Sequence, residues 1–301
     1  MKQKFINLVE KAEVVLACRV SPKQKADIVN MVRDENPEAI TLAIGDGAND
    51  VNMICQAHVG VGIQGLEGMQ AARSSDYAIS QFKYMRSLLF FHGREAYRRN
   101  SILAIYMFYK NILFVMPQFW FGFWSAFTGQ TLYEAIIYQA YNIVFTAFPI
   151  MIFAIFDQEQ KRRHFISDPK HYWVGLHDEY YSLPLLTFVV IKGILNGLLI
   201  LVFSFFTLNG LNIGPDQHTD SFWMTGTLCY GLVVINANAF VCQQTSTHTR
   251  MSLVWLSLSI LSWFFIFWLE NTQPWSQPIY RSFGETFSDG RVWLVIFLCL
   301  W

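Results

Sequence analysis

The stretch AITLAIGDGAND, residues 39–50, passes from an apolar segment into a turn that carries two glycines and two aspartates. The apolar part predicts a buried β-strand, and the glycines allow a sharp turn into a following helix. Asp46 and Asp50 flank that turn. Proteins bind Mg²⁺ through one or two carboxylates, together with water and phosphate. The stretch therefore predicts either a magnesium site or an ordinary Gly-Asp turn that caps a helix.

The surrounding residues 1–100 alternate short β-rich runs with helical patterns, which is typical of parallel βαβ units. Ser21-Pro22 predicts a helix start, with Ser21 as N-cap and Pro22 at the first helical position, and Asn36-Pro37 predicts its end. Further helices are expected near Asn49 and Glu67, followed by a charged helix over residues 81–100. The expected strands are residues 14–18, 39–44, 59–63 and 77–79.

Lys25 follows the first expected strand, in the stretch CRVSPKQK, residues 18–25. The carboxyl ends of parallel strands share one edge of a sheet, where open α/β folds bind ligands. A lysine there can neutralise charge on phosphoryl oxygens. Taken alone, Lys25 is better interpreted as a solvated helix residue, but a second motif at the same edge shifts the balance toward phosphate chemistry.

The rest of the 301-residue chain has a membrane composition. Apolar residues make up 53% of the sequence and charged residues 15%, against about 25% in soluble proteins. Residues 1–100 hold 13 of the 22 basic and 11 of the 22 acidic side chains. The zero net charge argues against nucleic acid as a partner, and the five widely spaced Cys residues indicate neither a disulfide framework nor a zinc site.

Apolar runs of about 20 residues predict membrane spans. The loop over residues 157–183 carries four basic residues, which places it in the cytosol together with the N-terminal head. Residues 1–20 carry several charges and contain no apolar run of secretory length, so we do not expect a targeting signal in them. The predicted multi-pass organisation is a head over residues 1–90, a stalk over residues 91–100, and spans near residues 101–124, 133–156, 184–208, 221–241 and 252–269, with a truncated span at residues 291–301.

Lys110 lies nine residues into the first of these spans, about 14 Å along a helix and near the middle of a hydrocarbon core about 30 Å thick. A charge at this depth needs a partner, water or a function, although snorkelling is an alternative. A lysine repels cations and attracts a phosphate or carboxylate, which favours a lipid headgroup over a metal ion as the transported species. Asn111 and Asn142 are candidate polar companions of Lys110, and Asn142 is also compatible with a role in helix packing.

These motifs resemble those of P-type ATPases: Arg19-Val20-Ser21-Pro22 with Lys25, then Gly45-Asp46-Gly47-Ala48-Asn49-Asp50, then a charged stalk entering the membrane. Ser74-Ser75-Asp76-Tyr77-Ala78-Ile79, Tyr109-Lys110-Asn111 and Gly129-Gln130-Thr131 are similar to the type-IV subfamily, the phospholipid flippases. The resemblance covers nearly the whole chain and is most specific up to about residue 160.

The resemblance implies an α/β haloacid-dehalogenase-like, Rossmannoid partial domain, followed by an all-α transmembrane bundle. Asp46 and Asp50 would hold Mg²⁺, Lys25 would steady the phosphoryl group, and Arg19 and Asn49 would lie near the ATP or its phosphate. The implied activity is ATP-driven movement of phospholipid from the outer to the cytosolic leaflet, with a possible two-span accessory subunit. Such flippases carry a lysine on the substrate path at the position of Lys110.

The chain departs from this family pattern in several respects, since the nucleotide-binding domain, the actuator domain and the first four spans of such pumps have no counterpart in it. The pumps phosphorylate the Asp of an Asp-Lys-Thr-Gly motif, and the 301 residues contain no such tetrapeptide. We therefore expect a fragment that is inactive by itself, and no catalytic nucleophile is assigned. Two alternatives stay open, a fragment of a cation-transporting P-type ATPase and a catalytically inactive truncated membrane protein. The lipid headgroup and the host organelle are not predicted.

Overall fold

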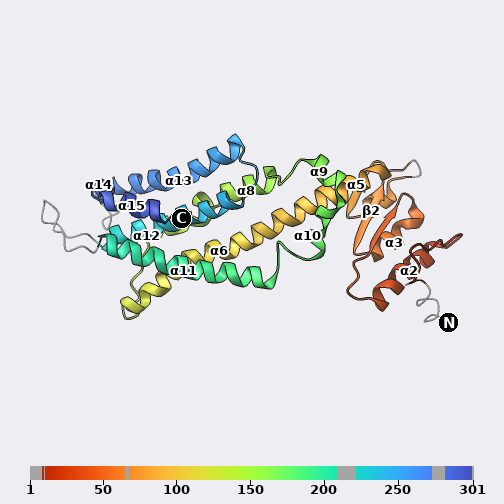
Figure 1. Ribbon diagram of the computed structural model, residues 1–301, viewed down its shortest axis with the longest axis horizontal. Helices are drawn as coiled ribbons and strands as arrows, with labels where there is room; N and C mark the ends of the chain where they lie inside the picture. The colour runs from red at the N-terminus through yellow and green to blue at the C-terminus, as the bar shows by residue number, and fades with distance from the viewer. Residues whose placement is uncertain (1–8, 10, 66–67, 209–221, 273–281, 300–301) are drawn as a thin grey trace. The chain divides into compact units, whose positions relative to one another are not determined.

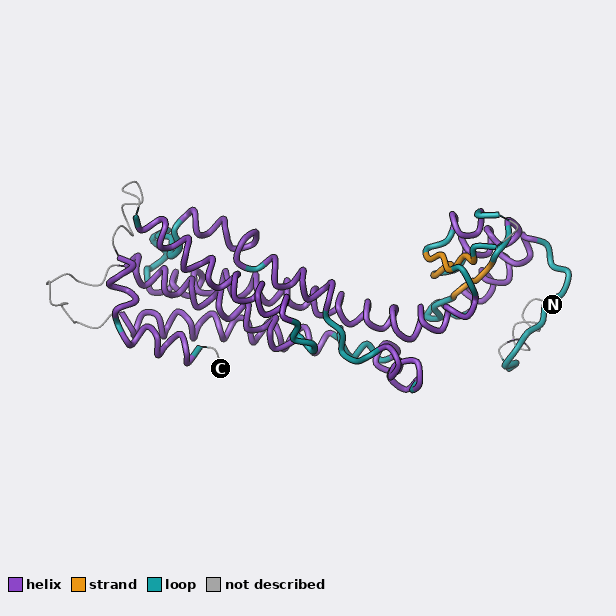
Figure 2. The backbone as a smooth tube through the Cα atoms, turned by 90° about the horizontal axis from the view of Figure 1, so that it is seen from above, coloured by secondary structure: helices purple, strands orange, loops and turns teal. Residues whose placement is uncertain are grey.

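The computed structural model of the chain describes residues 9, 11–65, 68–208, 222–272 and 282–299. They fall into two compact units, Met1–Leu89 and Phe90–Trp301. Among the described residues, the strands all belong to the first unit, and the second unit is built from helices (Figures 1 and 2).

The first unit contains a small parallel sheet with the strand order β1 (Leu42–Gly45), β2 (Val59–Ile63), β3 (Tyr77–Ile79). Its register pairs Leu42 with Val59 and Val61 with Tyr77. The helices between the strands are η1 (Ala48–Asp50) with α3 (Val51–Gln56), and α4 (Gln70–Ser74). The strands expected at residues 59–63 and 77–79 are confirmed, and β1 begins three residues later than predicted.

The strand predicted at residues 14–18 is wrong, because this segment has no regular secondary structure. Among the described residues, no backbone hydrogen bond joins it to the sheet. The side chains of Val14 and Leu16 are 75% and 87% exposed. Apolar β-branched residues favour a strand only when a neighbouring strand receives their backbone groups and their side chains. The described unit is thus a three-stranded parallel sheet with helices, smaller than the predicted α/β domain.

Helix α2 (Pro22–Glu35) places Lys25 one turn from its start. Its N-terminus is a capping box: the Gln24 amide donates to the Ser21 hydroxyl at 3.4 Å, and the Ser21 amide donates to the Gln24 side chain at 2.8 Å. The helix ends at Asn36, as Asn36-Pro37 predicted. Both predicted ends of this helix are confirmed.

The described residues contain five helical segments that are long and apolar enough to span a membrane. The first of them begins within the first unit, and the other four belong to the second unit. The first segment, Phe82–Trp124, includes α5 (Met85–Ser87), the π-helical η3 (Leu88–Gly93) and α6 (Arg94–Trp124). The second segment, Ala135–Phe156, includes α7 (Ala135–Ala140), the π-helical η4 (Tyr141–Phe145) and α8 (Ala147–Phe156). The other three segments are single helices: α11 (Leu183–Leu208), α12 (Phe222–Gln244) and α13 (Arg250–Asn271).

Shorter helices complete the described part of this unit. The connection after α8 contains α9 (Arg162–Ser167), η5 (Pro169–Tyr172) and α10 (Trp173–Leu176). Two further helices, α14 (Ser282–Ser288) and α15 (Gly290–Leu298), follow α13 in sequence, and α15 covers most of the segment predicted as a truncated span.

Helix α12 is the centre of the bundle and contacts α6, α8, α11 and α13. Tyr230 and Leu232 on α12 are at most 1% exposed, like Leu113 on α6 and Phe267 on α13. Helices α6 and α11 lie side by side (Figure 1). Large apolar side chains such as Phe206 remain exposed on the outer faces, which suits a surface in contact with lipid tails.

A buried ionic cluster joins the start of α6 to the segment after α8. The Arg98 guanidinium lies 2.6 Å from a carboxylate oxygen of Asp157 and 3.2 Å from one of Glu95. Arg94 contacts Glu159 at 2.7 Å. Because Arg98 and Asp157 are almost completely buried, this cluster fixes the two chain segments relative to each other.

Candidate functional site

The first candidate site lies at the carboxyl end of β1. The Lys25 ammonium donates to Asp50 Oδ1 at 2.6 Å, and the backbone N–H of Asp46 donates to Asp50 Oδ2 at 3.3 Å. Gly45 is required here, since a Cβ at this position would lie 2.3 Å from the Cβ of Asp50. The fold thus brings together Lys25 and Asp50, which are 25 residues apart in sequence.

The other predicted residues of this site lie on the surface. Asp46, Asn49 and Arg19 are exposed, and Arg19 adopts a left-handed backbone conformation with φ of 57°. Lys25, Asp46 and Asp50 line an open groove of about 550 Å³ whose floor includes Ile44. The structure therefore assembles three of the five predicted residues along one groove.

The donor set of this groove fits a hard divalent cation of the magnesium type. Asp46 presents an exposed carboxylate, and Asp50 presents a largely buried one that is already hydrogen-bonded to Lys25. Mg²⁺ usually keeps several waters and takes only one or two protein carboxylates. The described residues contain no group of three or more His, Cys, Asp or Glu side chains able to hold a metal, so a cation here depends on these two carboxylates.

The second candidate site surrounds Lys110 on α6. Lys110 is 4% exposed, and its ammonium donates to the Thr146 hydroxyl at 3.1 Å. In the described part of the chain, no carboxylate lies within ion-pair distance of this ammonium. An ammonium has three donor protons, and the structure gives this one a single hydrogen-bond acceptor. The buried cation is therefore left without a counter-charge among these residues.

Thr146 lies at a break in the second span, between η4 and α8. Its hydroxyl accepts from Lys110 and donates to the Tyr141 carbonyl at 2.8 Å. The Tyr141 hydroxyl in turn donates to the Lys110 carbonyl at 2.9 Å. Two hydrogen bonds thus join α6 to the second span, one through the Lys110 backbone and one through its side chain, and the bond to Thr146 holds the Lys110 ammonium.

Asn111 and Asn142 are not part of this network. Both side chains are exposed, and neither has a hydrogen bond to Lys110. Thr146 and Tyr141 make the hydrogen bonds to Lys110 that we had predicted for Asn111 and Asn142. Asn111 and Asn142, which directly follow Lys110 and Tyr141 in sequence, therefore lie on the outer faces of the same helices.

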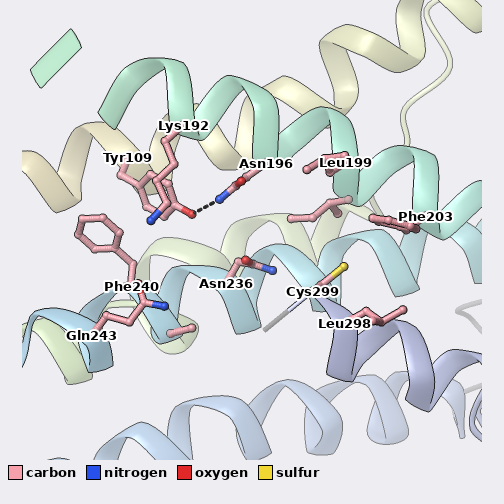
Figure 3. Close-up of a pocket in the computed structure, with 12 residues that line it drawn as sticks. Tyr109, Lys192, Asn196, Leu199, Phe203, Asn236, Phe240, Gln243, Leu298 and Cys299 are labelled. Atoms are coloured by element: carbon pink, nitrogen blue, oxygen red, sulfur yellow. Dashed lines mark hydrogen bonds between the residues drawn. The ribbon is translucent and has the colours of Figure 1, made fainter. Parts of the chain in front are cut away.

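Tyr109, the neighbour of Lys110, lines a separate cavity of about 190 Å³ (Figure 3). The Asn196 side chain of α11 donates to the Tyr109 hydroxyl at 2.9 Å. Lys192, also on α11, lies near the Phe240 ring of α12, with 5.7 Å between its ammonium and the ring centroid. Asn236 of α12 and Leu298 of α15 also line this cavity. The first two residues of the Tyr-Lys-Asn motif, Tyr109 and Lys110, thus serve two different interfaces of the bundle.

A comparison with known families gives a match over residues 72–301, which include Lys110 and its network, to the family described as phospholipid-translocating P-type ATPase C-terminal. The chain belongs to this family.

Curated members of the family align over most of the chain. A phospholipid-transporting ATPase of Schizosaccharomyces pombe is 39% identical over 87% of the chain and 21% of its own length. The human phospholipid-transporting ATPase IG is 34% identical over 99% of the chain and 27% of its own length. Phospholipid-transporting ATPase DRS2 of Saccharomyces cerevisiae is 34% identical over 97% of the chain and 22% of its own length. The chain spans about a quarter of the length of these relatives.

Sequence reasoning missed Thr146 as the partner of Lys110. The only signal for it is indirect: Pro149 predicts a distorted helix nearby, because proline lacks the N–H that an uninterrupted helix needs. Nothing in the sequence indicated that the distortion would face Lys110.

Proposed function

We propose that this family member takes part in ATP-driven, Mg²⁺-dependent translocation of phospholipid from the outer to the cytosolic leaflet of a membrane. The observation that carries the proposal is Lys110, a buried cation without a counter-charge in the described structure. An anionic phosphate or carboxylate of a lipid headgroup supplies the charge that such a site lacks.

In this proposal the head performs the phosphate chemistry. Asp46 and Asp50 bind Mg²⁺ at the groove beside β1. Cation binding weakens the pairing of Asp50 with Lys25, so the Lys25 ammonium becomes available to phosphoryl oxygens. Arg19 and Asn49, exposed near the same edge, contact ATP or its phosphate. The phosphorylated Asp lies outside these 301 residues, so the head acts together with the segments that its relatives carry beyond the matched quarter.

The lipid path runs along the first two spans. Lys110 binds the headgroup, while Asn111 and Asn142, exposed on the same helices, offer amide hydrogen bonds along the route. Asn111 and Asn142 lie on the outer face, from which the headgroup reaches the buried Lys110 while the acyl chains stay in the hydrocarbon.

The proposed topology places the head and the segment over residues 157–183 in the cytosol, on the argument that Lys161, Arg162, Arg163 and Lys170 favour that side. A two-span accessory subunit is a further proposed partner, and it rests on the family alone.

The test uses a chimera in which this chain replaces the matching segment of phospholipid-transporting ATPase DRS2. Lys110→Ala should lower lipid-stimulated ATP hydrolysis by about tenfold to a hundredfold, because a hydrogen bond to a charged group contributes about 1.5–3 kcal/mol. Lys161→Ala removes an exposed lysine outside the spans and should leave the rate unchanged. Equal lipid stimulation in the Lys110 variant and the parent chimera would remove Lys110 from the lipid path. A chimera that is phosphorylated but insensitive to every lipid would contradict the function itself.

A further inference from the structure

The break in the second span leaves the carbonyl of Phe145 without its helical donor. In an α-helix the carbonyl of residue i accepts from the N–H of residue i+4, and for Phe145 that residue is Pro149, which has no N–H. Phe145 and Pro149 are both buried, so water does not replace the missing donor. An unpaired buried carbonyl is unfavourable, and the surrounding helices have to satisfy it.

Two other spans supply the donors. The Asn238 side chain of α12 donates to the Phe145 carbonyl at 3.0 Å, and the Ser259 hydroxyl of α13 also contacts this oxygen. Asn238 and Ser259 are 0% and 4% exposed, and Ser259 lies 3.2 Å from the Asn238 side-chain oxygen. The two donors are 93 and 114 residues away from Phe145 in sequence. They form a brace between three spans, centred on one carbonyl.

The braced carbonyl is one residue away from the partner of Lys110. Thr146 follows Phe145 directly and leaves helical geometry, with φ of −130°. Its hydroxyl accepts from the Lys110 ammonium and donates to Tyr141, on the same turn. A shift of the Phe145 peptide therefore moves the only hydrogen-bond acceptor that the structure gives the Lys110 ammonium.

We propose that Asn238 and Ser259 are positioning residues for Lys110, acting through the Phe145 carbonyl and Thr146. The inference deepens the proposed function, on which its relevance to lipid transport rests, while its effect on the lysine itself does not depend on transport. Neither residue contacts the headgroup. Loss of either donor lets the turn between η4 and α8 relax, and the Lys110 side chain becomes more mobile and more reactive.

The chain offers matched control positions on the same two helices. The Asn236 side chain on α12 donates only within its own helix, to Leu232 at 3.0 Å. The Ser262 hydroxyl on α13 likewise donates to Ser259 within that helix, at 2.7 Å. Substitution at these two positions removes the same kinds of side chain from the same helices and leaves both side chains that contact the Phe145 carbonyl in place.

The first experiment measures amine reactivity in the 301-residue chain reconstituted into lipid nanodiscs. Formaldehyde with a borane reductant methylates accessible lysines, and peptide mass spectrometry gives the rate at Lys110 relative to Lys192 on α11. We expect Asn238→Ala and Ser259→Ala to raise this ratio at least about fivefold, since each leaves a buried carbonyl one donor short. Ser259→Thr keeps the hydroxyl and should restore the low ratio.

The outcomes separate the inference from a general loss of packing. Asn236→Ala and Ser262→Ala should match the parent chain, and a rise at Lys110 and Lys192 together would show nonspecific loosening and overturn the inference. An unchanged ratio in both brace variants would overturn it as well.

A second measurement in the chimera distinguishes this inference from the proposed function. The brace variants should raise the lipid concentration needed for half-maximal ATP hydrolysis more than they lower the maximal rate, because the headgroup contact is displaced and the phosphate site is untouched. If Lys110→Ala abolishes lipid stimulation but the brace variants behave like the parent, the positioning role is wrong and the lipid path stands. If the brace variants expose Lys110 while Lys110→Ala has no effect on lipid stimulation, the positioning role stands and the lipid path is wrong.

Discussion

Replacing Asp157 by Asn should destabilise the helical unit by about 3 kcal/mol. The Asp157 and Arg98 side chains are 1% and 2% exposed and lie 2.6 Å apart. The second carboxylate oxygen of Asp157 accepts from the backbone N–H groups of Ser246 and Thr247, at 3.1 and 2.9 Å. An Asn side chain offers only one oxygen, so it loses either the guanidinium or the two backbone donors and turns an NH₂ group toward them.

The magnitude follows from the burial of these groups. Removing one partner of a buried ion pair costs about 3–5 kcal/mol. Arg98 keeps its contact with Glu95 at 3.2 Å, which places the expected loss at the lower end of that range. Exposed pairs contribute only about 0–1 kcal/mol. Asp289, paired with Arg291, is the matched control: its side chain is 25% exposed, and an Asn there still caps α15.

The assay is chemical unfolding of the purified chain in detergent micelles, followed by tryptophan fluorescence. Asp157→Asn should lower the free energy of unfolding by about 3 kcal/mol, and Asp289→Asn by less than about 1 kcal/mol. In a double-mutant cycle with Arg98→Met, the two substitutions should be less than additive, because the second removes the charge that the first leaves unpaired. A loss below about 1 kcal/mol for Asp157→Asn, or strict additivity, would refute the role assigned to the cluster.

Two further predictions concern the head and the connection after α8. Asp50→Asn should weaken binding of Mn²⁺, used as a paramagnetic probe for Mg²⁺, by at least about tenfold, because one of two carboxylate ligands is lost. The control Asp34→Asn removes an exposed carboxylate on α2 and should bind Mn²⁺ like the parent. Equal Mn²⁺ affinity in the Asp50 variant and the parent would contradict the metal assignment. Partial burial raises the pKa of Glu159, but the hydrogen bond and the charge of Arg94 outweigh this effect and hold the pKa below its usual value of 4.5. The Glu159 carboxylate therefore stabilises the fold above pH 4.5, and this stabilisation is lost as the pH falls through the lowered pKa. The stability difference between the parent and Glu159→Gln should therefore be largest near neutral pH and shrink below pH 4.5, and a difference independent of pH would rule out this ion pair as its source.

Several parts of the fold could be predicted because they depend on local sequence. Ser21-Pro22 and Asn36-Pro37 set both ends of α2 through capping and the missing proline N–H, which involve only neighbouring residues. The spans could be predicted from hydropathy, since a helix satisfies its own backbone wherever it lies in a membrane. The strand prediction for residues 14–18 was wrong for the opposite reason: strand formation depends on a partner strand, and local β-propensity does not supply one.

The same distinction applies to the candidate sites. The sequence by itself determined the chemistry available: carboxylates at Asp46 and Asp50 after a strand, and a lysine at mid-membrane depth in Lys110. Only the tertiary structure decided the partners. It paired Lys110 with Thr146 instead of Asn111 or Asn142, because the second span leaves helical geometry at Thr146, directly after the π-helical turn, and the side chains of Asn111 and Asn142 are exposed. Residue types and their depth follow from the chain, whereas hydrogen-bond partners between spans depend on how distant helices pack.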